Sequence, residues 1–286
     1  MSTTAGVVGI REAGGGFRDD LRAVRVVWRR ELLRFARNRL RIVTSLMQPV
    51  LFLFILGSGL ARMLPSTSGG VDFRTFMFPG VIAMTILFTA LFSAISIVWD
   101  REFGFLREML VAPVRRGAIV VGKCAGGATV ATFQGMIMLL LAGLVHVPYS
   151  PVLLLTLLGE MALAAGALTA LGMALASRIT QIESFQAVMQ FVVLPMFFLS
   201  GAVFPASGLP TWLNALTRVD PLSYAVDPMR RAVFHHVSAP ASFQHQLNPG
   251  IAWGGWRLPV GLELLLVAAA GTLMLALAVQ QFNRTE

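Results

Sequence analysis

A densely charged stretch, residues 100–123, lies between two long runs that contain no Asp, Glu, Lys or Arg. These charge-free runs are residues 75–99 and 124–159. A charged side chain at the centre of a bilayer costs about 3 kcal/mol on insertion scales, so a segment this polar does not lie in hydrocarbon. The sequence therefore predicts that residues 100–123 lie at a membrane surface while their neighbours cross the membrane.

The composition is typical of an integral membrane protein. Hydrophobic residues make up 56% of the chain and charged residues 13%, and the mean hydropathy of +0.73 excludes a disordered chain. The formal net charge of +9 raises the question of a nucleic-acid partner. Most basic residues, however, lie in residues 11–41 and 100–123, beside hydrophobic runs. The positive-inside rule explains this charge, so we expect no nucleic-acid partner.

Charge-poor runs of about 20 residues, enough to cross hydrocarbon about 30 Å thick, predict six transmembrane helices. Pro49 lies within the first run and predicts a kink, and Pro79 and Pro195 lie within the second and fifth. The expected spans are residues 42–61, 75–99, 124–145, 152–177, 184–204 and 260–282. The expected fold is an all-α membrane protein whose transmembrane domain comprises residues 42–286.

The region before the first span predicts a tail and an amphipathic helix. Residues 1–19 are Gly-rich and show no signal-peptide pattern, so we expect a flexible cytoplasmic tail. Residues 20–41 place apolar side chains on a narrow helical stripe and arginines beside it, which is typical of a helix at the membrane interface. The residues expected to contact lipid are Trp28, Arg29, Arg30 and Arg34. Nucleic-acid binding is the alternative, disfavoured because the stripe runs directly into a span.

The distribution of basic residues sets the expected orientation. The N-terminal region, residues 100–123, residues 178–183 and the C-terminus carry most of the Arg and Lys, so we place them all in the cytoplasm. Residues 205–259 contain several Pro, Gly and Trp residues and only broken hydrophobic patches. They predict an extracellular cap before the last span, with short helices returning toward the membrane.

A G-x-x-x-x-G-K pattern at Gly117, Gly122 and Lys123 resembles a phosphate-binding loop. Cys124 stands where such a loop needs a hydroxyl for magnesium, and an apolar run follows instead of a soluble helix. We interpret these residues as glycines at the entrance to a span, with a lysine that extends to the membrane surface. Cys124 is also the only cysteine, and the histidines lack metal-ligand spacing, so we expect no metal or cofactor on this chain.

Three segments of the chain resemble the membrane permeases of type-2 ABC exporters, in particular those for daunorubicin resistance and nodulation-factor export. The segments read FGFLREMLVAPVRRGAIVVGK, FVVLPMFFLSGAVFP and PLSYAVDPMR, and the resemblance covers about residues 20–282. One departure is Arg115, where the family pattern has Ser. The resemblance implies a permease of the bacterial inner membrane, a separate ATPase subunit that binds ATP and magnesium, and a second permease chain.

The same resemblance implies that the first cytoplasmic loop, residues 100–123, docks on the ATPase. Phe103 begins an apolar helical face with Leu106 and Leu110, which predicts a short amphipathic helix at the membrane surface. The residues assigned to the ATPase contact are Glu102, Phe103, Gly104, Arg107 and Glu108. The alternative is a solvated charged loop without a partner.

Glu160 and Glu263 are acidic residues in otherwise apolar spans, toward the outer ends of those spans. An ionisable residue in this position is a candidate for the substrate pathway, for example as a ligand of a cationic substrate. Pairing within the bundle and extension to the membrane surface are the alternatives. Ala162, Gly166, Ala170 and Ala174 repeat at four-residue spacing and predict a helix-packing face.

The expected function is the permease subunit of an exporter that moves an amphipathic or lipid-like substrate, with drug or antibiotic efflux preferred. Export of a lipid or lipid-linked saccharide and a non-transporting scaffold or sensor are the alternatives. A membrane-embedded enzyme is disfavoured, because the sequence contains no H-E-x-x-H motif and no matched Asp pair within spans.

Overall fold

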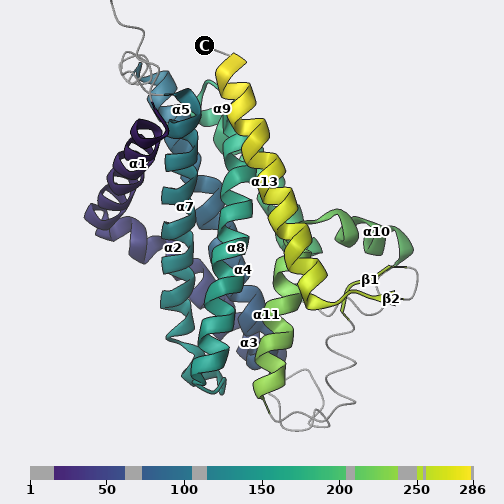
Figure 1. Ribbon diagram of the computed structural model, residues 1–286. Helices are drawn as coiled ribbons and strands as arrows, with labels where there is room; N and C mark the ends of the chain where they lie inside the picture. The colour runs from purple at the N-terminus through teal and green to yellow at the C-terminus, as the bar shows by residue number, and fades with distance from the viewer. Residues whose placement is uncertain are drawn as a thin grey trace, which may run out of the picture.

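The computed structural model describes residues 16–61, 73–104, 115–203, 210–237, 250–253 and 256–284. Within these ranges the chain is almost entirely helical, apart from a small antiparallel hairpin of β1 (Ala252–Trp253) and β2 (Trp256–Arg257). Four long helices run through the molecule side by side, and α1 (Phe17–Arg37) lies against one of them, α7 (Figure 1). The four are α4 (Phe73–Ser93), α7 (Arg116–Leu139), α8 (Pro151–Ala176) and α13 (Val260–Arg284).

Five helical segments in the described ranges are long and apolar enough to cross a membrane. They are Arg39–Gly59, Phe73–Glu102, Pro151–Ala176, Ile182–Leu199 and Val260–Arg284. The helix at the expected third span, α7, is not among them, although it has 24 residues. Lys123, Gln134 and several glycines lower its hydropathy. A mainly helical protein with five candidate spans is therefore confirmed, and the sixth span stays a prediction.

The first candidate span contains a change of helix type after Pro49. It consists of α2 (Arg39–Leu51), the π-helical turn η1 (Phe52–Leu56) and α3 (Gly57–Ala61). Proline has no amide hydrogen, and its ring clashes with the carbonyl four residues earlier, so the hydrogen-bond ladder is interrupted. The wider turn of η1 follows three residues after Pro49, in the stretch where the sequence predicted a disturbance.

Helix α4 and its continuation α5 (Ile95–Glu102) form the centre of the bundle. In the most apolar stretch of this span 72% of the residues are buried, against 17% in that of the first span. Phe76, Ile82 and Leu87 are fully buried here. The two helices meet at Ala94, and α5 carries the chain directly into the charged stretch that begins at residue 100. The start of that stretch is therefore continuous with the buried centre of the bundle.

Two glycines of α7 allow α1 to approach closely. A Cβ atom on Gly122 would lie 2.9 Å from the carbonyl oxygen of Val24, and one on Gly126 would lie 2.7 Å from Cβ of Glu31. Real Cβ atoms do not come so close to a backbone atom or to another Cβ atom, so a larger residue would push α1 outward. The glycines near the entrance to the expected third span thus form the surface on which α1 packs.

The small-residue stripe predicted on α8 does not form one packing face. Ala170 and Ala174 are buried, but Ala162 is exposed and a Cβ atom on Gly166 would meet open space. The close contact with α13 lies elsewhere, where a Cβ atom on Gly271 would be 2.8 Å from Cα of Ala167. Within this chain the stripe thus packs at Ala170 and Ala174, and its use by a second permease chain stays a prediction.

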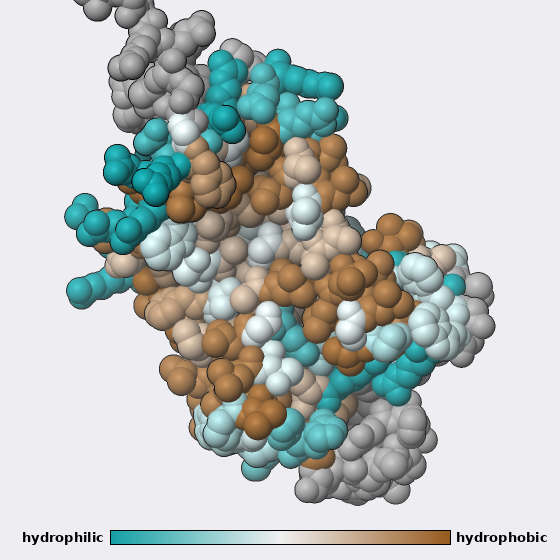
Figure 2. All heavy atoms as spheres, viewed as in Figure 1, coloured by the Kyte–Doolittle hydropathy of each residue, from teal (hydrophilic) through white to brown (hydrophobic). Residues whose placement is uncertain are grey.

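The region expected as a cap contributes one helix to the bundle. After α9 (Ile182–Leu199), α10 (Thr211–Val219) and the hairpin project to one side, whereas α11 (Ser223–His236) packs against α4, α8 and α13 (Figure 1). Most side chains of α11 are buried. Figure 2 shows hydrophobic side chains over the middle of this face, with hydrophilic ones gathered at the end that carries α5 and around the outer side of α1.

Candidate functional site

A buried ion pair joins the two ends of the charged stretch 100–123. Nζ of Lys123, on α7, lies 2.5 Å from Oδ2 of Asp100, on α5. The same ammonium donates to the carbonyl oxygen of Ser96 at 3.0 Å and to its hydroxyl at 3.1 Å. The Lys123 side chain is 2% exposed and that of Asp100 is 5% exposed. Because each charge is buried and needs the other, the loop is closed at its base.

The interpretation of Lys123 as a side chain that extends to the membrane surface was therefore wrong. Helix α1 covers α7 at this level, and the neighbouring α5 supplies a carboxylate at hydrogen-bond distance. A nearby counter-charge holds the ammonium inside the bundle. The one sequence signal for the pair is that Asp100 and Lys123 are the first and last charges of the stretch, each bordering a charge-free run.

Helix α1 adds two further charges to this pair. Arg30 NH2 lies 3.3 Å from Oδ1 of Asp100, and Oε1 of Glu31 lies 3.7 Å from Nζ of Lys123. We call Arg30, Glu31, Asp100 and Lys123 the loop-base cluster. Its charges alternate in sign and come from three helices, so it connects α1 to both ends of the loop.

Of the residues of α1 that were expected to contact lipid, some contact the bundle and others are exposed. Nε1 of Trp28 donates to Oγ1 of Thr129 at 3.1 Å, so the indole is turned toward α7. The guanidinium of Arg34 lies over the ring of Trp99, 5.8 Å from its centroid. Arg29 is exposed. The aromatic and basic residues of this helix thus bind it to the bundle as well as facing outward.

Three of the five residues assigned to the ATPase contact lie in the described ranges, and Arg107 and Glu108 lie outside them. Oε2 of Glu102 accepts a hydrogen bond of 2.9 Å from the amide of Ile182, at the start of α9. Phe103 is 57% exposed and its ring packs beside that of Trp99. Gly104 ends this part of the chain with φ of +78°, a conformation that favours glycine.

Arg101, which the sequence did not single out, fixes the start of the loop to the end of α8. Its NH1 donates to the carbonyl oxygens of Ser177 and Ile179, both at 3.1 Å. A cation at the C-terminal end of a helix is stabilised by the unpaired carbonyls there. Together with Glu102, Arg101 makes the link between α8 and α9 part of the same assembly as the loop-base cluster.

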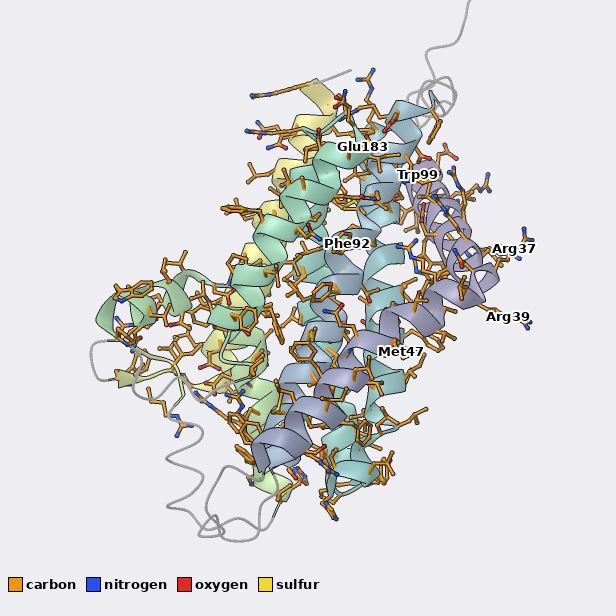
Figure 3. All side chains as sticks on the ribbon, turned by 180° about the vertical axis from the view of Figure 1, so that it is seen from behind. Arg37, Arg39, Met47, Phe92, Trp99 and Glu183 are labelled. Atoms are coloured by element: carbon orange, nitrogen blue, oxygen red, sulfur yellow. The ribbon has the colours of Figure 1, made fainter. Side chains whose placement is uncertain are left out.

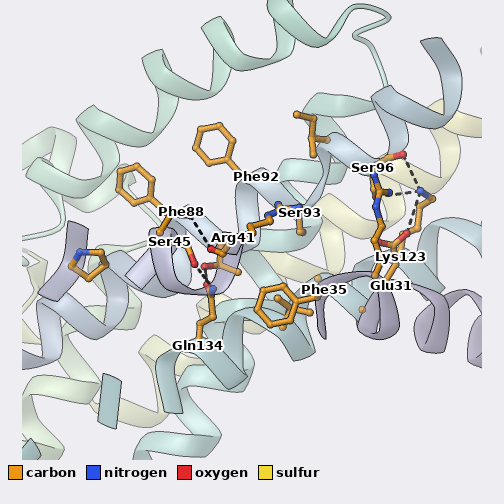
Figure 4. Close-up of a pocket in the computed structure, with 18 of the residues that line it drawn as sticks. Glu31, Phe35, Arg41, Ser45, Phe88, Phe92, Ser93, Ser96, Lys123 and Gln134 are labelled. Atoms are coloured by element: carbon orange, nitrogen blue, oxygen red, sulfur yellow. Dashed lines mark hydrogen bonds and ion pairs between the residues drawn. The ribbon is translucent and has the colours of Figure 1, made fainter. Parts of the chain in front are cut away.

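A cavity of about 220 Å³ lies beside the loop-base cluster, between α1, α2, α4 and α7 (Figure 4). Its wall combines charged groups with hydroxyls, amides and aromatic rings. Gln134 of α7 bridges Ser45 of α2 and Thr89 of α4 by hydrogen bonds. The lining includes Glu31, Arg34, Arg41, Gln48, Phe88, Phe92, Ser93 and Lys123. Such a wall can hold an amphipathic molecule or its polar head.

The structure places Glu160 and Glu263 in different surroundings. Oε1 of Glu263 lies 3.0 Å from NH2 of Arg231, and Arg231 also pairs with Asp227 and donates to the carbonyl of Leu258 at 2.8 Å. This network ties α13 to α11, as the pairing alternative describes. Glu160 is 6% exposed, and its Oε2 has no hydrogen-bond partner among the described residues.

Asp220 is a buried acid between α10 and α11. Its carboxylate accepts from the amide of Leu222 at 2.9 Å and from the hydroxyl of Ser223 at 3.3 Å. Burial raises the pKa of Asp220 to about 7, although these two hydrogen bonds lower it. The carboxyl is therefore protonated in a large fraction of molecules near neutral pH.

Comparison with known proteins gives one consistent result. The family model described as "ABC-2 type transporter" matches residues 22–234, a range that contains the loop-base cluster and the cavity. Nodulation protein J of Rhizobium leguminosarum bv. trifolii is 32% identical over 214 residues, which cover 73% of this chain and 80% of that protein. Nodulation protein J of Rhizobium meliloti is 33% identical over 208 residues, 71% of this chain and 78% of its own length. An Escherichia coli protein named "Probable multidrug ABC transporter permease" is 31% identical over 160 residues, 55% of this chain and 43% of that protein.

Proposed function

This chain belongs to the ABC-2 type transporter family, and from this premise we propose that it is the permease subunit of an ATP-driven exporter. A separate ATPase subunit supplies the hydrolysis of ATP and binds the magnesium. The permease receives the resulting motion through residues 100–123, and two permease chains form the pathway.

The observation that carries this proposal is the loop-base cluster. Asp100 and Lys123 hold the two ends of the loop together, so a force on the loop is passed to α5 and α7 instead of being absorbed by separation of its ends. Arg30 extends the connection to α1, and Glu102 extends it to α9. A loop without a mechanical role would not need a desolvated ion pair at its base, which costs solvation energy to build.

The proposed contact with the ATPase consists of Glu102, Phe103, Gly104, Arg107 and Glu108. Two exposed aromatic side chains support it, because Phe103 is 57% exposed and the adjacent Trp99 is 40% exposed. Apolar rings exposed beside charged groups are typical of an interface that is buried only in a complex. Glu102 already binds α9, so in this proposal it positions the loop as well as facing the partner.

We propose that α7, at the position of the expected third span, also crosses the membrane and brings the number of spans to six. Both termini and residues 100–123 then lie in the cytoplasm of a bacterial cell. Helix α7 has 24 residues, close to the 26 of α8, and packs along α4 and α8. Its two most polar side chains beyond the first turn are buried inside the bundle, since Lys123 is 2% exposed and Gln134 is 1% exposed. A span whose polar residues face protein does not need the hydropathy of one that faces lipid.

The proposed cargo is an amphipathic molecule, with a drug or antibiotic preferred and a lipid or lipid-linked saccharide as the alternative. The wide apolar surface of the candidate spans, which carry few charged groups, supports an amphipathic cargo. The name of the Escherichia coli relative supports a drug. Large apolar side chains exposed on η1 and α9, such as Ile55 and Phe191, supply surface for a second permease chain.

The test is reconstitution with an ATPase that carries an intact phosphate-binding loop and is encoded beside this chain. We expect the two proteins to copurify and to transport a fluorescent amphipathic drug into inverted vesicles only when ATP is added. An ATPase variant with its phosphate-loop lysine replaced serves as the control and should assemble without exporting. Failure of the permease to bind any such ATPase, at normal expression, would overturn the proposal.

A further inference from the structure

The cavity beside the loop-base cluster is positively charged. Arg34, Arg41 and Lys123 line it together with one carboxylate, Glu31. Lys123 is bound by Asp100 and lies 3.7 Å from Glu31, so its charge is compensated. The two remaining cations, Arg34 and Arg41, line the same cavity. In the ranges that the structure covers, neither of these guanidinium groups makes an ion pair or a hydrogen bond, and the cavity therefore has the charge of an anion site.

The cavity continues into a shallow, open apolar groove along α2 and η1. Thr44 and Gln48 line both the cavity and the groove. Beyond them the wall of the groove is apolar and lies on the least buried of the candidate spans. Its lining residues are Met47, Leu51, Phe52, Ile55 and Leu56. Met47 is 52% exposed and Ile55 is 67% exposed, and Figure 3 shows Met47 on this helix.

We propose that this composite site binds an anionic membrane lipid, with its phosphate headgroup in the cavity and an acyl chain along the groove on α2 and η1. Arginine binds phosphate through two parallel N–H donors, and both Arg34 and Arg41 line the cavity. Basic pockets between membrane helices on the cytoplasmic side recognise the headgroups of anionic lipids. The amide of Gln48 supplies a further donor within the lining.

The continuity of the two surfaces favours a lipid over a free anion. Inorganic phosphate would satisfy the arginines but would leave the apolar groove without an occupant. A lipid would occupy both the cavity and the groove. Its headgroup would lie in the cavity and its acyl chain in the groove, and the link between them would lie at Thr44 and Gln48, which line both. This inference goes beyond the proposed function, since a permease that exports a different molecule would still bind this lipid.

The test measures lipid binding to the purified permease alone, by native mass spectrometry in detergent. Phosphatidylglycerol is the probe, and phosphatidylcholine and inorganic phosphate are compared with it. We expect Arg41→Gln and Arg34→Gln each to weaken phosphatidylglycerol binding about five- to tenfold, since a basic residue beside an anionic headgroup contributes about 1 kcal/mol. Arg39→Gln is the matched control, because Arg39 is exposed, does not line the cavity and points away from the bundle (Figure 3).

A second variant tests the groove. We expect Leu51→Gln to weaken phosphatidylglycerol binding while a monodisperse elution profile shows that the protein is folded. Equal losses in Arg41→Gln and Arg39→Gln would mean attraction to the general positive surface and would overturn the site. Inorganic phosphate that displaces the lipid at equal concentration would overturn the lipid as occupant. Because the ATPase is absent, these outcomes are independent of whether the exporter assignment holds.

Discussion

Nζ of Lys123 and Oδ2 of Asp100 lie 2.5 Å apart inside the bundle, although the two residues are 23 positions apart in the sequence. The pair closes a loop whose residues 105–114 lie outside the described ranges. Ser96 adds two hydrogen bonds to the ammonium, and α1 adds Arg30 and Glu31. The two ends of the loop are therefore joined to each other and to α1 by ion pairs and hydrogen bonds.

The first prediction concerns that ion pair. Lys123→Met leaves Asp100 buried with only Arg30 as a counter-charge, so we expect a loss of stability of up to about 3 kcal/mol. The double variant Asp100→Asn, Lys123→Met removes both charges and should recover part of the loss. Thermal unfolding followed by size-exclusion chromatography checks the order of stability among the wild type, the double variant and Lys123→Met. A double variant less stable than Lys123→Met would show that the pair is not the source of the effect.

The second prediction concerns the packing of α1 on α7. Gly126→Ala places a methyl group 2.7 Å from Cβ of Glu31, so α1 must shift and we expect destabilisation of about 1–3 kcal/mol. Gly159→Ala is the matched control, because a Cβ atom there meets nothing within 4 Å. Alanine favours a helix over glycine by about 1 kcal/mol, so the control should be neutral or stabilising. Equal melting temperatures for the two variants would contradict the close packing of α1 on α7.

The third prediction concerns the ATPase contact. We expect Glu108→Arg to insert normally but to capture less ATPase, or to assemble without coupling ATP hydrolysis to export. A charge pair broken from one side in a desolvated interface costs about 2–5 kcal/mol. Arg37→Glu is the control, since Arg37 points away from the bundle in Figure 3. Unchanged assembly and export in Glu102→Arg, Arg107→Glu and Glu108→Arg, singly and combined, would show that the loop is only solvated.

The fourth prediction concerns the pH dependence of stability. The pKa of Asp220 is raised to about 7 in the folded protein, above the value near 3.8 of an unperturbed carboxyl. The stabilisation from this acid is therefore complete below about pH 4 and is lost as the pH rises through 7. Asp220→Asn should remove that part of the pH dependence, which melting curves at pH 5 and pH 8 would reveal. An identical pH profile in the variant would exclude a buried neutral Asp220.

The fifth prediction concerns topology. In a Cys124→Ala background, we expect a membrane-impermeant thiol reagent added outside intact cells to label Ser238→Cys but not Met109→Cys. The expectation follows from the excess of basic residues in the N-terminal region and in residues 100–123. Labelling of both positions after permeabilisation is the control for accessibility. The reverse pattern in intact cells would invert the orientation.

Local composition was enough to locate the candidate spans. The sequence predicted spans at residues 152–177 and 260–282, and the helices there are Pro151–Ala176 and Val260–Arg284. Hydrophobicity accumulates residue by residue along a segment, and the cost of a charge in hydrocarbon does not depend on distant partners. The same reasoning separated the charged stretch 100–123 from its neighbours.

Only the tertiary structure decided what the polar residues do. Lys123 could extend to the surface or stay buried, and the position of Asp100 across the bundle decided for burial. Trp28 could face lipid or protein, and Thr129 on α7 supplies its partner. Helix α11 could lie above the membrane or within the bundle, and it packs against α4, α8 and α13. A buried polar group is stable only when a partner compensates it, and partners distant in the sequence are brought together by the packing of helices, which periodicity along one chain segment does not encode.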